Sequence, residues 1–285
     1  MKKVSFYFLF LILFLLLNCR KVINEKIITV SILPQKYFVE RIVGDKFKIN
    51  VMVGPGREPH DYEPLPGQMI ELSRSALYLS IGVPFEKIWL KKIAGANPEM
   101  KIVQTQDGIA LRQFGDDEKD SDEEGSDTHI WLSPKLVEIQ CQNIYNAVVS
   151  IDPDNEKLYK KNLDDILNEL DELSEKLSNA FDKANIREFI VFHPAWGYFA
   201  DEFGLKQIAI EIEGKEPAPK QIAEIIETAK EKKIKVVFVQ KQFSGNSAKA
   251  IAEEIKGSIV FIDPLSEDYI NNLNNVAETI INSMK

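Results

Sequence analysis

The chain has 285 residues, with 35 Lys and Arg, 44 Asp and Glu and a formal net charge of −9, so it is long enough for two domains of ordinary size. The acidic balance argues against a nucleic-acid partner, because phosphates require a basic surface. The sequence has two cysteines, Cys19 and Cys141. Cys141 falls in an apolar-periodic helix and is expected to be a buried structural thiol without a disulfide.

The first segment of the chain predicts export. Lys2 and Lys3 precede an apolar run over residues 6–17 that is too short to span a bilayer comfortably as a permanent helix. The run ends at Leu-Leu-Asn-Cys19, which resembles the lipobox of bacterial lipoproteins, although Asn18 stands where Gly, Ala or Ser is usual. We therefore expect a signal peptide over residues 1–18, lipidation at Cys19 and a tether over residues 19–26. The alternative is a plain signal anchor with an incidental cysteine.

Such a chain works outside the cytoplasmic membrane. We expect it to be anchored by its lipid at the outer face of that membrane, or to lie in the periplasm. Without Lys2 and Lys3 the balance becomes 33 basic against 44 acidic residues, a net charge of −11. This charge is compatible with cationic ligands, but it is weak support for them.

Residues 27–153 alternate short β-branched segments with helices, which predicts parallel βαβ units and an α/β lobe. We expect strands at 27–33, 48–53, 76–81 and 101–104, and helices at 34–43, 68–73, 85–93 and 135–150. Two stretches interrupt the alternation. The loop over residues 54–64 is dense in Gly and Pro, and the acidic stretch Asp116–Asp127 has eight acids, one Lys and no apolar residue. We expect this acidic stretch to be a mobile surface loop.

A long helix is predicted over residues 154–184, a stretch without Gly or Pro. Its apolar residues follow an unbroken 4-3-4-3 spacing, which places them in one stripe along the helix. At 1.5 Å per residue such a helix is roughly 46 Å long. The stripe consists of Tyr159, Leu163, Ile166, Leu170, Leu173, Leu177, Ala180 and Ala184. A coiled-coil dimer arm is the alternative, but the repeat ends after about four heptads.

Residues 185–285 repeat the alternation of the first half, so the long helix joins two α/β lobes. We expect strands at 188–192, 206–211, 236–239 and 258–262, and helices at 196–203, 219–230, 247–255 and 269–283. The chain's three histidines follow predicted strands or loops: His60, His129 and His193. Asp263 follows the last predicted strand. Ligands of open parallel sheets bind at the carboxyl ends of strands, and three imidazoles with one carboxylate would suit Zn²⁺. Each histidine taken alone is also compatible with a hydrogen-bonded structural role.

Five motifs together resemble one known family. They are Gly-Arg-Glu-Pro-His60-Asp-Tyr-Glu-Pro, Asp127-Thr-His129-Ile-Trp-Leu-Ser-Pro, His193-Pro-Ala-Trp-Gly-Tyr-Phe-Ala, Glu213-Gly-Lys-Glu-Pro-Ala-Pro and Asp263-Pro-Leu. In this order they resemble the cluster A-I (cluster 9) metal-binding proteins of ABC importers, over nearly the whole mature chain. The resemblance implies two α/β lobes bridged by one long helix, with zinc or manganese in the cleft between them. It assigns His60, His129, His193 and Asp263 as the metal ligands.

The resemblance also implies the function: an extracytoplasmic lipoprotein, not an enzyme, that captures Zn²⁺ and delivers it to an ABC permease and its ATPase, as a monomer. Three histidines favour zinc because manganese prefers oxygen donors, but manganese remains the alternative. In zinc-type members the loop that the acidic stretch replaces is usually rich in histidine, and here it is not.

Several assignments stay open at this stage. Glu58 is a second candidate for the fourth ligand. Glu211, Glu213 and Glu216 are expected at the cleft rim, and Trp131, Trp196 and Tyr198 are expected to wall the site. The rival functions are a zinc hydrolase, which keeps a coordination position open for water, and a binding protein for a metal chelate or haem. No His-Glu-x-x-His motif supports the hydrolase.

Overall fold

The computed structural model describes residues 26–114, 126–184, 186–211, 217–241 and 246–284. The predicted signal peptide, the lipidation site Cys19 and residues 116–125 of the acidic stretch lie outside these ranges. Within them, no helix combines the length and the hydrophobicity needed to cross a membrane.

The first lobe is built on a parallel sheet of four strands in the order β2-β1-β3-β4. The strands are β1 (Ile27–Ile32), β2 (Lys48–Val53), β3 (Ser75–Ser80) and β4 (Lys101–Gln104). β1 is buried along its whole length, as expected for an inner strand with helices on both faces. The helices between the strands are α2 (Leu33–Val43), α3 (Pro66–Leu72) and α4 (Pro84–Ala96), each with a Pro in its first turn.

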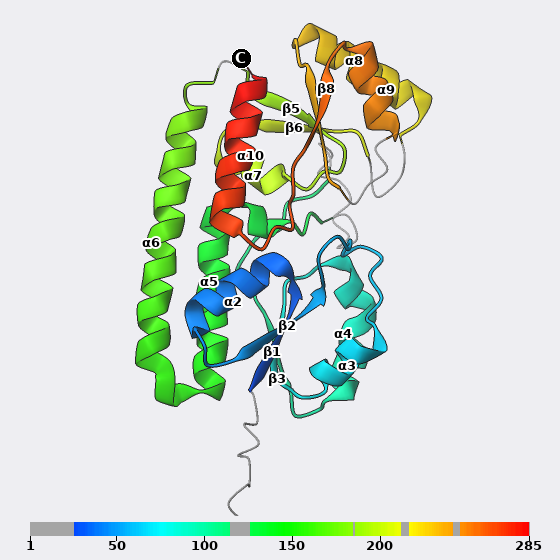
Figure 1. Cartoon of the computed structure of the whole chain (residues 1–285). Coiled ribbons are helices and arrows are strands. Elements are labelled where there is room, and N and C mark those ends of the chain that lie inside the picture. The colour runs from blue at the N-terminus through cyan, green and yellow to red at the C-terminus, as the bar shows by residue number, and fades with distance from the viewer. Residues whose placement is uncertain (1–25, 115–125, 185, 212–216, 242–245, 285) are drawn as a thin grey trace, which may run out of the picture.

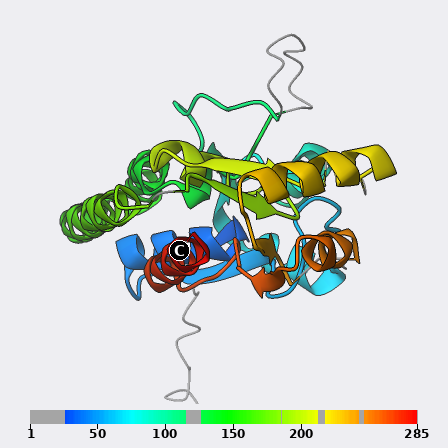
Figure 2. The ribbon, with the colours of Figure 1, turned by 90° about the horizontal axis from the view of Figure 1, so that it is seen from above.

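The second lobe repeats this plan with the strand order β6-β5-β7-β8, again all parallel. Its strands are β5 (Glu188–Val191), β6 (Lys206–Ala209), β7 (Val236–Val239) and β8 (Ser258–Phe261). The helices between them are α7 (Gly197–Glu202), α8 (Pro219–Glu231) and α9 (Asn246–Glu254). α8 and α9 lie on the side of the molecule away from the long helix (Figures 1 and 2).

The long helix is α6, which spans Glu156–Phe181 and follows a 3₁₀ turn at Pro153–Asn155. It is shorter than the predicted helix over 154–184 because Pro153 begins the 3₁₀ turn and the chain turns again after Phe181, where Ala184 N bonds Phe181 O. Six Leu, Ile and Tyr positions of the predicted stripe are buried, together with Phe181. They pack against α2, against α5 (Pro134–Ile151) and against α10 (Tyr269–Ser283) of the same chain.

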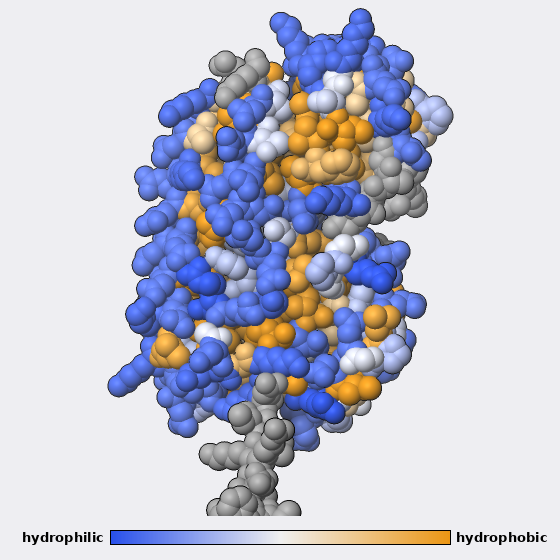
Figure 3. Space-filling view, in the orientation of Figure 1, coloured by the Kyte–Doolittle hydropathy of each residue, from blue (hydrophilic) through white to orange (hydrophobic). Residues whose placement is uncertain are grey.

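Contacts inside the chain therefore cover the apolar face of α6, and no coiled-coil partner is needed to bury it. Hydrophilic side chains occupy most of the opposite, outward face of this helix (Figure 3). The two-lobe α/β fold with parallel sheets is confirmed, whereas the exact division into residues 27–153, 154–184 and 185–285 stays a prediction.

One hydrophobic core runs through both lobes. It includes Phe38 of α2, Leu170 of α6 and Phe199 of α7, and a smaller core lies between the second sheet and helices α8 and α9. α10 belongs to the second lobe in sequence, but its first residue Tyr269 meets Phe38 edge to face, with ring centroids 4.8 Å apart. A continuous core resists hinge motion more than a polar interface does, so the lobes hold the site between them in a well-defined position.

Candidate metal site

His60 lies on the Gly- and Pro-rich loop that follows β2. Gln68 of α3 holds the end of this loop, since its Nε2 donates to Met52 O at 2.6 Å and its Oε1 accepts from Leu65 N at 3.0 Å. Pro59 O accepts from Phe85 N of α4 at 3.2 Å. The Nδ1 of His60 lies 2.5 Å from Glu58 Oε1. The loop is thus fixed at both sides of His60, although 37% of the histidine side chain is exposed.

His129 lies just before the 3₁₀ turn η2 (Ile130–Leu132), which leads into α5. The Oδ1 of Asp127 accepts two hydrogen bonds from this residue, from its backbone N at 3.0 Å and from its Nδ1 at 2.8 Å. Both side chains are buried. The ring of Trp131 lies beside that of His129, with centroids 5.1 Å apart, so the imidazole is held by a carboxylate on one side and an aromatic wall on another.

His193 follows β5 at the carboxyl end of the second sheet. Its Nδ1 lies 3.2 Å from Oε1 of Glu211, a residue that follows the neighbouring strand β6. Both residues are buried, with 5% of His193 and 4% of Glu211 exposed. The pairing of β5 with β6 therefore places a carboxylate against this imidazole from a position 18 residues away.

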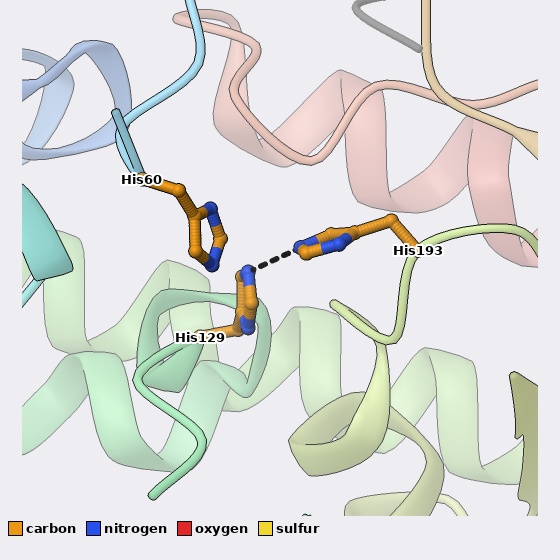
Figure 4. Close-up of side chains that lie close together, drawn as sticks. All are labelled: His60, His129 and His193. Carbon is orange, nitrogen blue, oxygen red and sulfur yellow. Dashed lines mark hydrogen bonds between the residues drawn. The ribbon is translucent and has the colours of Figure 1, made fainter. Parts of the chain in front are cut away.

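The structure brings the three histidines together although they come from different parts of the chain (Figure 4). Their ligand atoms all lie within 4.8 Å of one another, and Nε2 of His129 is 3.3 Å from Nε2 of His193. Two nitrogens bound to one tetrahedral zinc at about 2.05 Å would be about 3.3 Å apart. A pocket beside them is lined by Glu58, Pro59, His129, Trp131, His193 and the Pro264–Leu265 turn. The site is therefore built from both lobes.

Each imidazole has a carboxylate at its Nδ1, and this arrangement fixes the chemistry of the other nitrogen. A neutral imidazole that donates Nδ1–H to a carboxylate presents the lone pair of Nε2. With Glu58, Asp127 and Glu211 as acceptors, the Nε2 atoms of His129 and His193 face each other as lone-pair donors. Such a group of electron pairs is suited to bind a cation.

The local charges act differently on the pKa values of these groups. Burial would lower the pKa of His60, but the hydrogen bond and the charge of Glu58 outweigh it and raise that pKa above 6.5. Burial lowers the pKa of His129 below 6.5. The charges of the other two histidines also lower this pKa, whereas the hydrogen bond and the charge of Asp127 raise it. Burial would raise the pKa of Glu58, but His60 and the neighbouring histidines lower it below 4.5. Protons therefore compete with a metal more strongly at His60 than at His129.

Asp263 does not belong to the group of ligand atoms within 4.8 Å of one another among the described residues. Its Oδ1 accepts from Leu265 N at 2.9 Å, and its backbone O accepts from Asn272 Nδ2 at 2.7 Å. Trp131 Nε1 donates to Pro264 O at 2.7 Å, which fixes the turn at the pocket wall. The assignment of Asp263 as a metal ligand stays a prediction.

The other predicted site residues have distinct positions. Trp131 lines the pocket as expected. Trp196 packs in the core against Phe199, with ring centroids 5.6 Å apart, and is not among the residues that line the pocket. Tyr198 bonds Arg112 N and Asp127 O, so it acts on the support of His129. Of the three glutamates expected at the rim, Glu211 is buried against His193, and Glu213 and Glu216 lie outside the described residues.

The expectation that the whole stretch Asp116–Asp127 is a surface loop is wrong at its last residue. Asp127 is 0% exposed, because Oδ1 accepts hydrogen bonds from His129 and Oδ2 lies 3.6 Å from the guanidinium of Arg112. The role of three carboxylates as partners of the histidines was not predicted from the sequence. A signal for two of them was present: Glu58 and Asp127 each stand two residues before a histidine. Glu211 had no such signal, because only strand pairing brings it to His193.

Comparisons with known proteins identify the family of this chain. The chain matches the family described as "Zinc-uptake complex component A periplasmic" (ZnuA) over residues 28–283. The crystal structure of a ZnuA deletion mutant with zinc bound superposes with a TM-score of 0.86 and 42% identity, covering 92% of this chain and 98% of that one. The high-affinity zinc uptake system protein ZnuA of Bacillus subtilis is 30% identical, covering 78% of this chain and 73% of its own length.

A relative with a different metal is also similar. The manganese ABC transporter substrate-binding lipoprotein PsaA of Streptococcus anginosus is 26% identical over 80% of this chain and 77% of its own length. The family match spans nearly all of the described residues, including all three histidines. The chain therefore belongs to the ZnuA family of periplasmic zinc-uptake components.

Proposed function

We propose that this chain captures Zn²⁺ outside the cytoplasmic membrane and delivers it to an ABC importer. The observation that carries the proposal is the convergence of three imidazoles, each with a carboxylate at Nδ1 and therefore with Nε2 available for a cation. Membership of the zinc-uptake family supports the same function. The ion is the cargo, so its binding and release, with no chemical conversion, are the activity.

We propose that His60, His129 and His193 bind the ion, with Asp263 or a water at the fourth position. The 3.3 Å separation of the His129 and His193 nitrogens already fits a tetrahedral ion. His60 is the most exposed of the three, so the ion enters and leaves past its side chain in this proposal. Glu58 serves His60 as an orienting partner in this proposal, because its Oε1 bonds Nδ1, and it is the alternative to Asp263 at the fourth position.

Zinc is favoured over manganese by the donor set. Three imidazoles suit Zn²⁺, whereas Mn²⁺ prefers oxygen ligands. Manganese remains the second candidate, because PsaA, named as a manganese transporter protein, is among the relatives. A zinc hydrolase would also use three protein ligands and a water. Its general base would have to be free to act, whereas Glu58, Asp127 and Glu211 each bond a histidine.

The partners follow from the transport proposal. We propose an ABC permease and its cytoplasmic ATPase as the recipients, a monomeric binding protein, and an anchor through a lipid on Cys19. The supporting observation for the anchor is the Leu-Leu-Asn-Cys sequence after the apolar run.

A direct metal analysis tests the function. The chain is purified without added metal, stripped with a chelator, and titrated with Zn²⁺ and with Mn²⁺ in the presence of a competing chelator of known affinity. We expect one bound ion per chain and much tighter binding of Zn²⁺ than of Mn²⁺. The variant His60→Ala/His193→Ala serves as control and should lose tight binding. One Mn²⁺ bound more tightly than Zn²⁺ would refute the zinc assignment, and binding of neither ion would refute metal capture.

A further inference from the structure

Arg112 is not one of the proposed metal ligands, but it lies between Asp127 and helix α7. It is two residues before the end of the described segment 26–114, and the chain returns at Ser126 and Asp127. Asp127 N donates to Arg112 O at 2.8 Å, and Gln113 pairs with Ser126 as an antiparallel bridge. Residues 112–113 and 126–127 thus form a short two-stranded stem, and its second strand leads directly into the segment of His129.

This stem is attached to helix α7 of the second lobe. The hydroxyl of Tyr198 accepts from Arg112 N at 2.9 Å and donates to Asp127 O at 2.8 Å, so one side chain of α7 bonds both strands of the stem. Nε of Arg112 lies 3.2 Å from Oδ2 of Asp201, one helical turn further along α7. α7 begins four residues after His193. The attachment therefore joins the segment that carries His129 to the segment that follows His193.

The carboxylate of Asp127 needs the arginine for its second oxygen. Oδ1 accepts from the backbone N and the Nδ1 of His129. Oδ2 is buried and, within the described part of the chain, accepts no hydrogen bond, but it lies 3.6 Å from Nη1 of Arg112. Asp127 is 0% exposed, and a buried carboxylate without a countercharge is strongly destabilised. The guanidinium therefore balances the charge of the group that orients His129.

Gly197 makes room for this arrangement. A Cβ on Gly197 would lie 1.4 Å from Nη1 of Arg112 and 2.8 Å from Oδ2 of Asp127. Both distances are below any van der Waals contact, so the ion pair can lie against the start of α7 only because this residue has no side chain.

We propose that Arg112 is a positioning residue of the metal site. Its guanidinium holds Asp127 against α7, and Asp127 in turn fixes the ring of His129 so that Nε2 points at the ion and at His193. The inference rests on the proposed metal-binding function, because it assigns a role in the geometry of that same site. The proposal also states that the distance between Nε2 of His129 and Nε2 of His193 depends on the contact of Arg112 and Asp127 with α7 of the second lobe.

A double-mutant cycle tests whether Arg112 acts through Asp127. Zinc affinity is measured by competition with a chelator for the purified chain and for R112A, D127N and the double variant. Loss of a partner that orients a metal-bound histidine typically weakens metal binding 10- to 100-fold. We expect about tenfold weaker binding for R112A, 10- to 100-fold for D127N, and no further loss when R112A is added to D127N.

Three more variants separate positioning from folding. R112K keeps the charge and should recover part of the affinity that R112A loses. G197A should displace the guanidinium and crowd Oδ2 of Asp127, so it should weaken binding at least as much as R112A. Q113A, on the same stem, removes the side-chain bond to Ser126 and should leave the affinity within twofold of the parent. The metal-free melting temperature of every variant shows whether it is folded.

The outcomes distinguish this inference from the function on which it rests. An R112A affinity equal to the parent's would overturn the positioning role, and so would an equal loss from R112A in the parent and D127N backgrounds. A loss that R112K does not reduce at all would indicate general disruption and would also count against it. If the parent chain itself bound no zinc, the result would refute the proposed function and not specifically the role of Arg112.

Discussion

Replacement of His193 by Ala tests whether one ion is held between the two lobes. His193 is the histidine that follows a strand of the second sheet, and it is 5% exposed. Structural zinc sites bind with apparent free energies of about 10–16 kcal/mol shared by four ligands, or about 2.5–4 kcal/mol for each. We therefore expect His193→Ala to weaken zinc binding on the order of 10²- to 10³-fold.

The assay is a calorimetric titration with a competing chelator, supported by thermal unfolding. At a free zinc concentration of 100 times the Kd, binding adds about 2.7 kcal/mol to the stability of the folded chain. This should raise Tm by roughly 5–10 °C for a chain of this size. At the same zinc concentration, a variant that binds 100-fold more weakly gains only about 0.4 kcal/mol, or roughly 1 °C.

The metal-free Tm is the control, because the substitution also leaves the buried Glu211 without its imidazole partner. Glu211→Gln keeps the histidine and should weaken binding by only 10- to 100-fold. If folded His193→Ala bound zinc as tightly as the parent, a site shared by both lobes would be wrong, and the transport proposal would lose its main support.

Three further predictions concern the segments around the site. Deletion of residues 115–125 should leave the equilibrium zinc affinity unchanged and slow capture only at low salt, since charge attraction is screened beyond about 10 Å at 0.1 M. A deletion extended through Asp127, which bonds His129, should reduce the affinity, and equal affinities for the two deletions in a chelator competition would contradict this. Zinc affinity should fall as the pH drops, beginning above pH 6.5, because the pKa of His60 is raised and its protonated form cannot bind metal. Titrations from pH 8 to 5.5 should show a flatter profile in this range for His60→Ala, and parallel profiles would refute the assignment. Mass spectrometry of the mature N-terminus should find an acylated Cys19 as the first residue, and an unmodified cysteine or another cleavage site would contradict the anchor.

Local patterns in the sequence predicted most of the secondary structure. The 4-3-4-3 spacing predicts α6 and its buried face, because helical periodicity depends on neighbours within a few turns. The alternation of apolar strands with helices predicts two parallel sheets, since parallel strands require crossover connections. The ends of α6 differ from the expected range because the 3₁₀ turn at Pro153–Asn155 depends on local hydrogen bonds that composition does not encode.

The sequence by itself also singled out His60, His129 and His193, because a chain with only three histidines offers few nitrogen ligands. Tertiary structure decided which distant groups support them. Glu211 reaches His193 through the pairing of β5 with β6, and Arg112 reaches Asp127 across the contact with α7. The acidic stretch shows the same division: its composition predicts a solvated loop, yet Asp127 is buried, bonded to His129 and 3.6 Å from the guanidinium of Arg112. The ion pair with Arg112, 15 residues earlier in the sequence, forms only in the folded chain, so no local pattern reveals it.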